Sequence, residues 1–264
     1  MPSNQDAKTV IVSGATYGIG RGITLDLARR GYRVIGFGLD TRQPGSAAEN
    51  GIQGTQEALL DEGLEADILE ADVASSADVN EVVSHALSFG TGIFGAVSNA
   101  AIRPSGSVLE TDEDTFDQVV AVNLKGPYLL ARAVIPYMIE GGGGAIVNIG
   151  SGAGWGKAGI AAYGASKGGM HALASALAYD HLKDGVRVNI VIPGPQTASG
   201  MVEEMVLSAG ALPGVVTVSG RNTEPQDIAN AVAFLLSDEA VQISGTIIDI
   251  GAFSNQGGVG QPRG

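Results

Sequence analysis

The stretch Ser13-Gly14-Ala15-Thr16-Tyr17-Gly18-Ile19-Gly20 stands between a short β-branched run, Thr9–Val12, and an amphipathic pattern, Ile19–Arg30. The run predicts a strand and the pattern predicts a helix, so the glycines form a strand-to-helix turn. Gly14 can take the tight turn, Gly18 lets the backbone approach a pyrophosphate, and Gly20 lets the helix pack close to the sheet. Because a helix N-terminus attracts anions, the turn predicts a dinucleotide site, against the alternative of a plain glycine-rich turn. The candidate cofactor contacts here are Gly14, Thr16, Tyr17, Gly18, Ile19 and Gly20.

The rest of the chain repeats this alternation of strand and helix. Further strands are expected at 33–37, 68–71, 95–98, 145–149, 186–191 and 246–250, and further helices near 56–62, 77–88, 115–139, 160–183 and 225–236. Residues 41–55 look like a loop, and residues 195–222 have no clear period. The expected strands are apolar almost throughout, which is typical of a parallel sheet covered on both faces. The sequence therefore predicts an α/β fold: a single doubly wound (Rossmann) domain over 1–264, with a seven-stranded parallel sheet and helices on both faces.

Composition limits the classes of function. The chain has 264 residues with 44% hydrophobic residues, enough for one sizeable core, and a net charge of −13 that disfavours nucleic acid as a partner. The lack of cysteine excludes disulfides, thiolate chemistry and cysteine-based zinc sites. His85, His171 and His181 show no metal-binding spacing, so no metal is expected. Without a secretory signal or a long apolar run, the sequence predicts a soluble, cytoplasmic protein without a membrane partner.

A second group of residues has the character of an acid–base site. Tyr163 and Lys167 are four positions apart on an expected helix and so share one face. A phenol is a poor base at neutral pH, but a nearby ammonium favours the phenolate, and the pair could then move a proton at a carbonyl oxygen. Ser151 follows an expected strand at the ligand-facing edge of the sheet, and Asn123 is a mediocre helix former inside a helical pattern. Taken alone, each of these residues is better explained by a structural role.

Taken together, the residues resemble the short-chain dehydrogenase/reductase family over roughly residues 8–251. Ser13–Gly20 is similar to its glycine motif, and Asn123, Ser151, Tyr163 and Lys167 match its catalytic tetrad. The remaining similar segments are Asp72-Val73 (adenine side), Ser98–Ala101 (its N-A-G segment, with Ser98 and Ala101 as departures), Pro193-Gly194 with Thr197 (nicotinamide side), and the C-terminal segments Glu224–Ala229 and Ser244–Gly251.

The resemblance implies an NAD(P)-dependent oxidoreductase that moves a hydride between a nicotinamide cofactor and a carbonyl or secondary alcohol. Tyr163 would be the general acid/base, and Lys167 would lower its pKa and bond the nicotinamide ribose. Ser151 would orient the substrate oxygen, and Asn123 would hold a water that continues the proton path. Cofactor contacts would come from the glycine turn and from Asp72, Val73, Asn99, Ala100, Tyr163, Lys167, Pro193, Gly194 and Thr197.

Departures from the family pattern concern the cofactor and one loop. Asp40 stands about where an acid commonly holds the adenosine ribose, which favours NAD(H) over NADP(H), although Arg42 nearby could meet a 2′-phosphate. Gly38 and Leu39 replace the acid and the arginine that NAD- and NADP-preferring members often carry. The interval from Ser151 to Tyr163 is one residue shorter than usual, which makes the geometry of the loop at 155–160 uncertain from sequence.

The resemblance also implies a mobile substrate lid near 195–222 and a homo-oligomer, a dimer or homotetramer, built on the helices at 115–139 and 160–183. Arg103 could meet an acidic substrate group or be a solvated loop residue, and Trp155 could line the pocket or pack in its loop. Two other functions stay open on the same fold: a non-catalytic dinucleotide sensor or scaffold, which the intact tetrad disfavours, and an isomerase or dehydratase. Substrate, direction and stereochemistry do not follow from the sequence.

Overall fold

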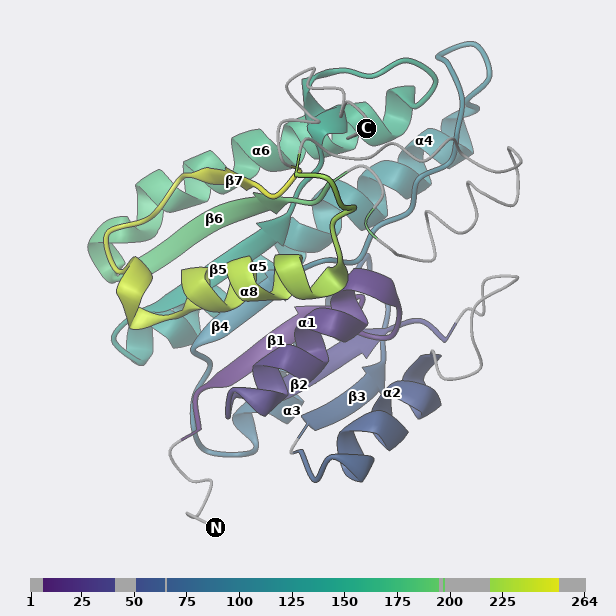
Figure 1. Cartoon of the computed structure of the whole chain (residues 1–264). Helices are drawn as coiled ribbons and strands as arrows, with labels where there is room; N and C mark the ends of the chain where they lie inside the picture. Colours follow the sequence, from purple (N-terminus) through teal and green to yellow (C-terminus); the bar gives the residue numbers. More distant parts are fainter. Residues whose placement is uncertain (1–6, 41–50, 65, 195–196, 198–218, 252–264) are drawn as a thin grey trace.

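The protein is built on one twisted sheet with helices on both of its faces (Figure 1). The structure is a computed structural model that describes residues 7–40, 51–64, 66–194, 197 and 219–251. The sheet has seven strands in the order β3-β2-β1-β4-β5-β6-β7, and all neighbouring pairs are parallel. The predicted fold class is therefore confirmed. The order reverses between β1 and β4, and the crevice beyond the carboxyl ends of these two strands is where doubly wound sheets bind ligands.

The elements follow the predicted alternation closely. The strands are β1 Thr9–Ser13, β2 Arg33–Gly38, β3 Ala66–Glu70, β4 Gly95–Ser98, β5 Gly144–Ile149, β6 Val186–Ile192 and β7 Ile247–Asp249. The helices are α1 Gly18–Arg29, α2 Gly51–Asp61, α3 Ser76–Leu87, α4 Glu113–Val120, α5 Gly126–Glu140, α6 Ala161–His181 and α8 Pro225–Leu236.

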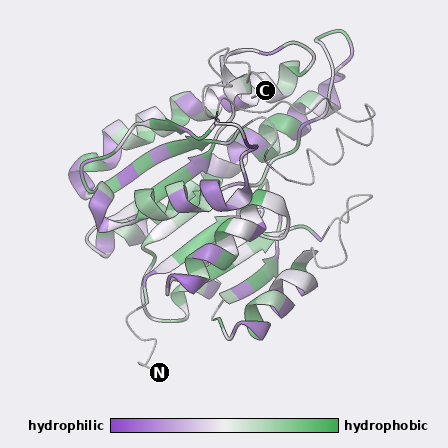
Figure 2. Ribbon diagram, in the orientation of Figure 1, coloured by the Kyte–Doolittle hydropathy of each residue, from purple (hydrophilic) through white to green (hydrophobic). Residues whose placement is uncertain are grey.

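Two apolar clusters cover the two faces of the sheet. Side chains of α1 and α8 pack with Val10 and Val12 on one face, whereas side chains of α3, α5 and α6 pack with Ile11 and Ile35 on the other. Figure 2 shows the hydrophobic colour concentrated on the strands and the hydrophilic colour on the outer helix surfaces. Because successive residues of each strand serve opposite clusters, the strands must be apolar at nearly every position.

Two predicted elements differ from the structure. The expected loop 41–55 is wrong in its last residues, because α2 already begins at Gly51. The helix is hard to predict from the sequence because Gly51 and Gly54 lie in its first turns and glycine is a poor helix former. The single helix expected at 115–139 is interrupted by a π-helical turn, Ala121–Lys125, between α4 and α5.

The predicted lid lies outside the described residues except for 197 and 219–222. Among the helices that are described, none is both long and apolar enough to cross a membrane. Within the same part of the chain, no three His, Asp or Glu side chains gather as a metal ion would require.

Candidate active site

The glycine turn after β1 has the close packing that the sequence predicts. Gly14 and Gly18 adopt φ values of 64° and 47°, in the left-handed region that favours glycine. A Cβ on Gly14 would lie 2.7 Å from the Ala100 Cα, and one on Gly20 would overlap the Gly14 carbonyl and the Asn99 amide. The backbone of the turn and of the segment after β4 therefore approach each other more closely than side chains would allow.

Polar side chains hold these two segments together. The Asn99 Nδ2 donates to the Gly14 carbonyl at 2.9 Å, and the buried Ser13 Oγ accepts from the backbone N–H groups of Asn99 at 3.1 Å and Ala100 at 3.3 Å. Sequence reasoning missed Ser13, because a serine that ends a strand gives no signal of its own. The contacts fix the shape of the crevice at the point where the strand order reverses.

A cleft of about 1010 Å³ opens along the carboxyl ends of the strands, from the glycine turn to the start of α6. It is somewhat larger than the volume common for small-molecule sites, as a dinucleotide with a substrate requires. The predicted site residues that line it are Gly14, Thr16, Tyr17, Gly18, Ile19, Asp72, Val73, Asn99, Ala100, Ser151, Tyr163, Lys167, Pro193, Gly194 and Thr197.

Tyr163 forms the wall of this cleft together with Ser151. The residue is only 7% exposed, and the side chain of Ser151 lines the cleft with it. Burial raises the pKa of the Tyr163 phenol, while the Ser151 side chain and the charge of Arg103 lower it by less. The predicted lowering by Lys167 is therefore wrong for this structure: desolvation is the larger effect, and the phenol is neutral at neutral pH.

Lys167 lies one helical turn further on, and its amine is buried. The Nζ donates to the Ile149 carbonyl at 2.8 Å and stands 5.8 Å from the centroid of the Tyr163 ring. Burial lowers the pKa of Lys167 to about 7. The amine therefore carries only part of a charge at neutral pH, which explains why it does little to favour the phenolate.

Asn123 lies behind the cleft wall, in the π-helical turn. It is fully buried, its Nδ2 donates to the Ile102 carbonyl at 2.8 Å and to the Ser166 Oγ at 3.1 Å, and its Oδ1 accepts from the Ile102 N–H at 2.9 Å. Both amide hydrogens are thus used. In a regular helix, the N–H of residue 127 would bond the Asn123 carbonyl, but residue 127 is proline and has no N–H.

The shortened loop between Ser151 and Tyr163 does not separate the two residues. Gly152–Trp155 form a single 3-10 turn capped by the Ser151 hydroxyl, and the loop end is tied to a neighbouring segment by a 2.7 Å bond from the Gly106 N–H to the Gly159 carbonyl. Trp155 is 57% exposed and packs against His171 with ring centroids 5.5 Å apart. It does not line the described cleft, so its packing role in the loop is the one observed.

Asp40 does not join the predicted group. Its side chain is exposed and accepts a 3.3 Å hydrogen bond from the Ile52 N–H at the start of α2. The cleft wall beside β2 is formed instead by Phe37, Gly38 and Leu39. Arg42, the alternative contact, lies outside the described residues. Gly20 also stays behind the wall, where it packs between the turn and Asn99.

Comparison with known proteins identifies the family. A family model described as Enoyl-(Acyl carrier protein) reductase matches residues 14–252. The 2-(S)-hydroxypropyl-CoM dehydrogenase 3 of Xanthobacter autotrophicus is 35% identical over 260 residues, which cover 96% of this chain and 96% of that protein. The chain belongs to the short-chain dehydrogenase/reductase family.

Solved structures agree in fold. The actinorhodin polyketide ketoreductase with NADPH superposes with a TM-score of 0.85 at 27% identity, covering 97% of this chain and 99% of that one. The 3-ketoacyl-(acyl-carrier-protein) reductase of Brucella melitensis complexed with NADH gives a TM-score of 0.79 at 28% identity, covering 94% and 98%. The family relationship supports an NAD(P)-dependent oxidoreductase activity, as the sequence predicts.

Proposed function

We propose that this protein interconverts a carbonyl compound and a secondary alcohol, with Tyr163 as the proton carrier. The observation that carries the proposal is the meeting of Tyr163, Ser151 and Lys167 in one cleft whose other end is the glycine turn. A nicotinamide dinucleotide fits this cleft by its size and by the turn at Gly14–Gly20, where backbone rather than side chains faces the crevice. When bound, it supplies or accepts the hydride.

The protein's own groups then handle the oxygen and its proton. The neutral Tyr163 phenol can donate its proton to a carbonyl oxygen as negative charge develops there. The Ser151 hydroxyl, which lines the cleft together with the phenol, can bind the same oxygen and fix its orientation. The buried Lys167 amine uses one of its donors on Ile149, which leaves others to face the cofactor ribose.

A proton path behind the phenol is part of the proposal. Since the amide of Asn123 is engaged with Ile102 and Ser166, its backbone carbonyl is the group left to hold a water. The π-helical turn and the proline at residue 127 remove the ordinary helical partner of that carbonyl. Asn123 would thus act through its backbone, with its side chain anchoring the segment after β4.

For the cofactor we propose a preference for NAD. Asp40, the acid that favours NAD in the sequence, does not line the described cleft. The support is instead that Tyr17, Gly38 and Leu39, which line the adenosine end, offer no cation for a 2′-phosphate.

Turnover of a panel of ketones and alcohols, followed at the nicotinamide absorbance band, tests the proposal. Tyr163→Phe should lower kcat by at least about a hundredfold, because it removes the proton carrier, while cofactor binding changes little. Tyr179→Phe is the matched control, since Tyr179 is 89% exposed on the same helix. A Tyr163→Phe enzyme of undiminished rate would disprove the mechanism, and tight cofactor binding without any turnover would favour a sensor.

A further inference from the structure

The substrate end of the cleft carries two cationic side chains that have no carboxylate or hydrogen-bond partner in the described part of the chain. Arg103, in the segment after β4, is half-buried and lines the cleft. Lys157, in the loop before α6, lines it from another side. Among the described residues, neither makes an ion pair or a hydrogen bond through its side chain.

Arg103 is placed close to the reacting groups. Its guanidinium carbon lies 5.9 Å from the centroid of the Tyr163 ring. At this distance the charge of Arg103 acts to lower the pKa of the phenol, although burial raises it by more. A ligand whose oxygen contacts the phenol would therefore extend past the guanidinium with only a short spacer.

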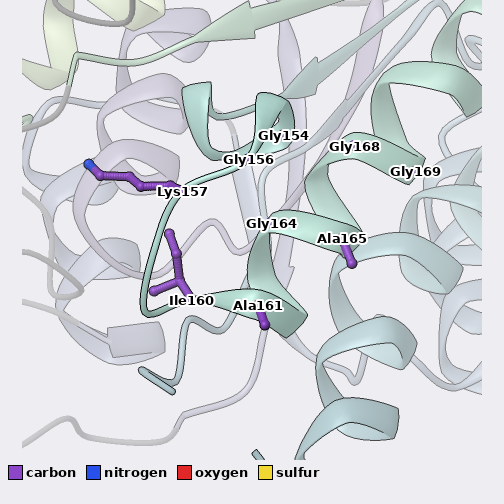
Figure 3. A pocket seen from close by; sticks show the side chains of 9 residues that line it. All are labelled: Gly154, Gly156, Lys157, Ile160, Ala161, Gly164, Ala165, Gly168 and Gly169. Atoms are coloured by element: carbon purple, nitrogen blue, oxygen red, sulfur yellow. The ribbon is translucent and has the colours of Figure 1, made fainter. Parts of the chain in front are cut away.

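Lys157 faces the same region. In Figure 3 its side chain projects outward from the loop, away from Ala165 on α6. Lys157 and Ile160 line the large cleft as well as the smaller glycine-walled pocket of about 310 Å³ beside α6. Lys157 is exposed, whereas Arg103 is half-buried.

The charge balance at this end is unusual for the chain. The protein has a net charge of −13, yet the only carboxylate among the described lining residues is Asp72, on the adenosine side. A half-buried guanidinium without a counter-ion is costly to desolvate, and an anionic ligand would offset that cost through charge-assisted hydrogen bonds.

We infer that the substrate is an oxo acid or its hydroxy acid: a carbonyl or alcohol carbon separated by a short spacer from an anionic group that Arg103 binds and Lys157 attracts. This inference rests on the proposed carbonyl chemistry and assigns it a substrate class. Arg103 is the specificity-determining residue, because a planar guanidinium can bind a carboxylate through two parallel hydrogen bonds. Lys157, which is exposed, contributes mainly to capture of the anion.

A keto acid and its methyl ester have similar shapes but differ in charge, so comparing them tests whether the protein recognises the anion. We would measure the cofactor-dependent reduction of acetoacetate and levulinate against their methyl esters. The wild-type protein should favour the acids, and Arg103→Met should raise KM for the acids so that their kcat/KM falls tenfold or more, with the esters changed less than about twofold. Lys183→Met is the control, since it removes the same charge beyond the far end of α6.

A binding measurement covers the case in which turnover is absent. Acetoacetate would be titrated calorimetrically into Tyr163→Phe loaded with NADH and into the Tyr163→Phe, Arg103→Met double variant. Loss of binding only in the double variant supports the anion site. Equal binding, or equal loss of acid and ester turnover in Arg103→Met, overturns the inference and leaves the oxidoreductase proposal intact. Absence of any cofactor oxidation with all four substrates and with the ketone panel would instead overturn the proposed function.

Discussion

Replacing Lys167 by methionine should remove most of the dependence of stability on pH in mildly alkaline solution. Burial lowers the pKa of Lys167 from 10.5 to about 7. Between these values the unfolded chain binds a proton at this lysine and the folded protein does not. Stability therefore rises with pH across the window, while below pH 7 the desolvation penalty is present in full.

The size of the effect follows from the width of the window. From pH 7 to about pH 9.5 the buried amine should add roughly 3 kcal/mol to the free energy of unfolding, at about 1.4 kcal/mol per pH unit. Above pH 10 the raised pKa values of Tyr163 and Tyr32 act in the opposite direction, because the folded protein then holds the extra protons. The measurement therefore stops below that pH.

Urea unfolding of the ligand-free protein at fixed concentration, at several pH values in this range, is the assay. The wild type and the exposed-lysine control Lys183→Met should show the rise, and Lys167→Met should show a nearly flat profile. A rise of equal slope in Lys167→Met, or a wild type whose stability does not change, would refute the assigned pKa and with it the account of why the phenol stays neutral.

Three further perturbations test other parts of the site. Asn123→Ala should lower the free energy of unfolding by about 3 kcal/mol in denaturant titrations, because it leaves the Ile102 backbone groups and the Ser166 hydroxyl without their buried partner; an effect below about 1 kcal/mol would contradict this. Leu39→Arg should strengthen NADPH binding about tenfold in fluorescence titrations by meeting a 2′-phosphate, whereas the exposed control Leu60→Arg on α2 should not. Because burial keeps the Tyr163 phenol neutral, alcohol oxidation should rise up to about tenfold per pH unit from pH 7 to 9 while carbonyl reduction stays flat, and an oxidation rate that levels off below pH 8 would count against it.

The fold could be predicted well because its signals are local. Apolar β-branched runs and turn glycines located β4 and α8 at their observed bounds, and parallel pairing follows from alternation alone. The start of α2 was not predicted, because Gly51 and Gly54 disfavour a helix. The Asp40 carboxylate, which the sequence predicts to bind the ribose, instead accepts a hydrogen bond from the first turn of α2.

The grouping of the candidate residues could be predicted from the sequence, but their pKa values could not. Spacing and the family resemblance grouped Ser151, Tyr163 and Lys167, and these three residues line one cleft in the structure. The direction of the Tyr163 pKa was wrong because burial, which outweighs the lysine, is a property of the packed loop and sheet and leaves no mark in the sequence. Distance along the chain predicted Asp40 at the ribose, whereas in the structure its carboxylate accepts a hydrogen bond from Ile52 and does not line the described cleft.

The π-helical turn at Ala121–Lys125 has a consequence for how the protein can vary in length. One residue more than an α-helical turn requires is accommodated there, which rotates α5 by roughly 100° about its axis relative to α4. This phase offset lets Gln118 face the cleft while Leu130 and Val134 face the sheet. Removing a single residue from the turn would give a continuous α-helix. It would also rotate either α4 away from the cleft or α5 away from the sheet. A deletion that makes this helix more regular should therefore destabilise the protein as a whole.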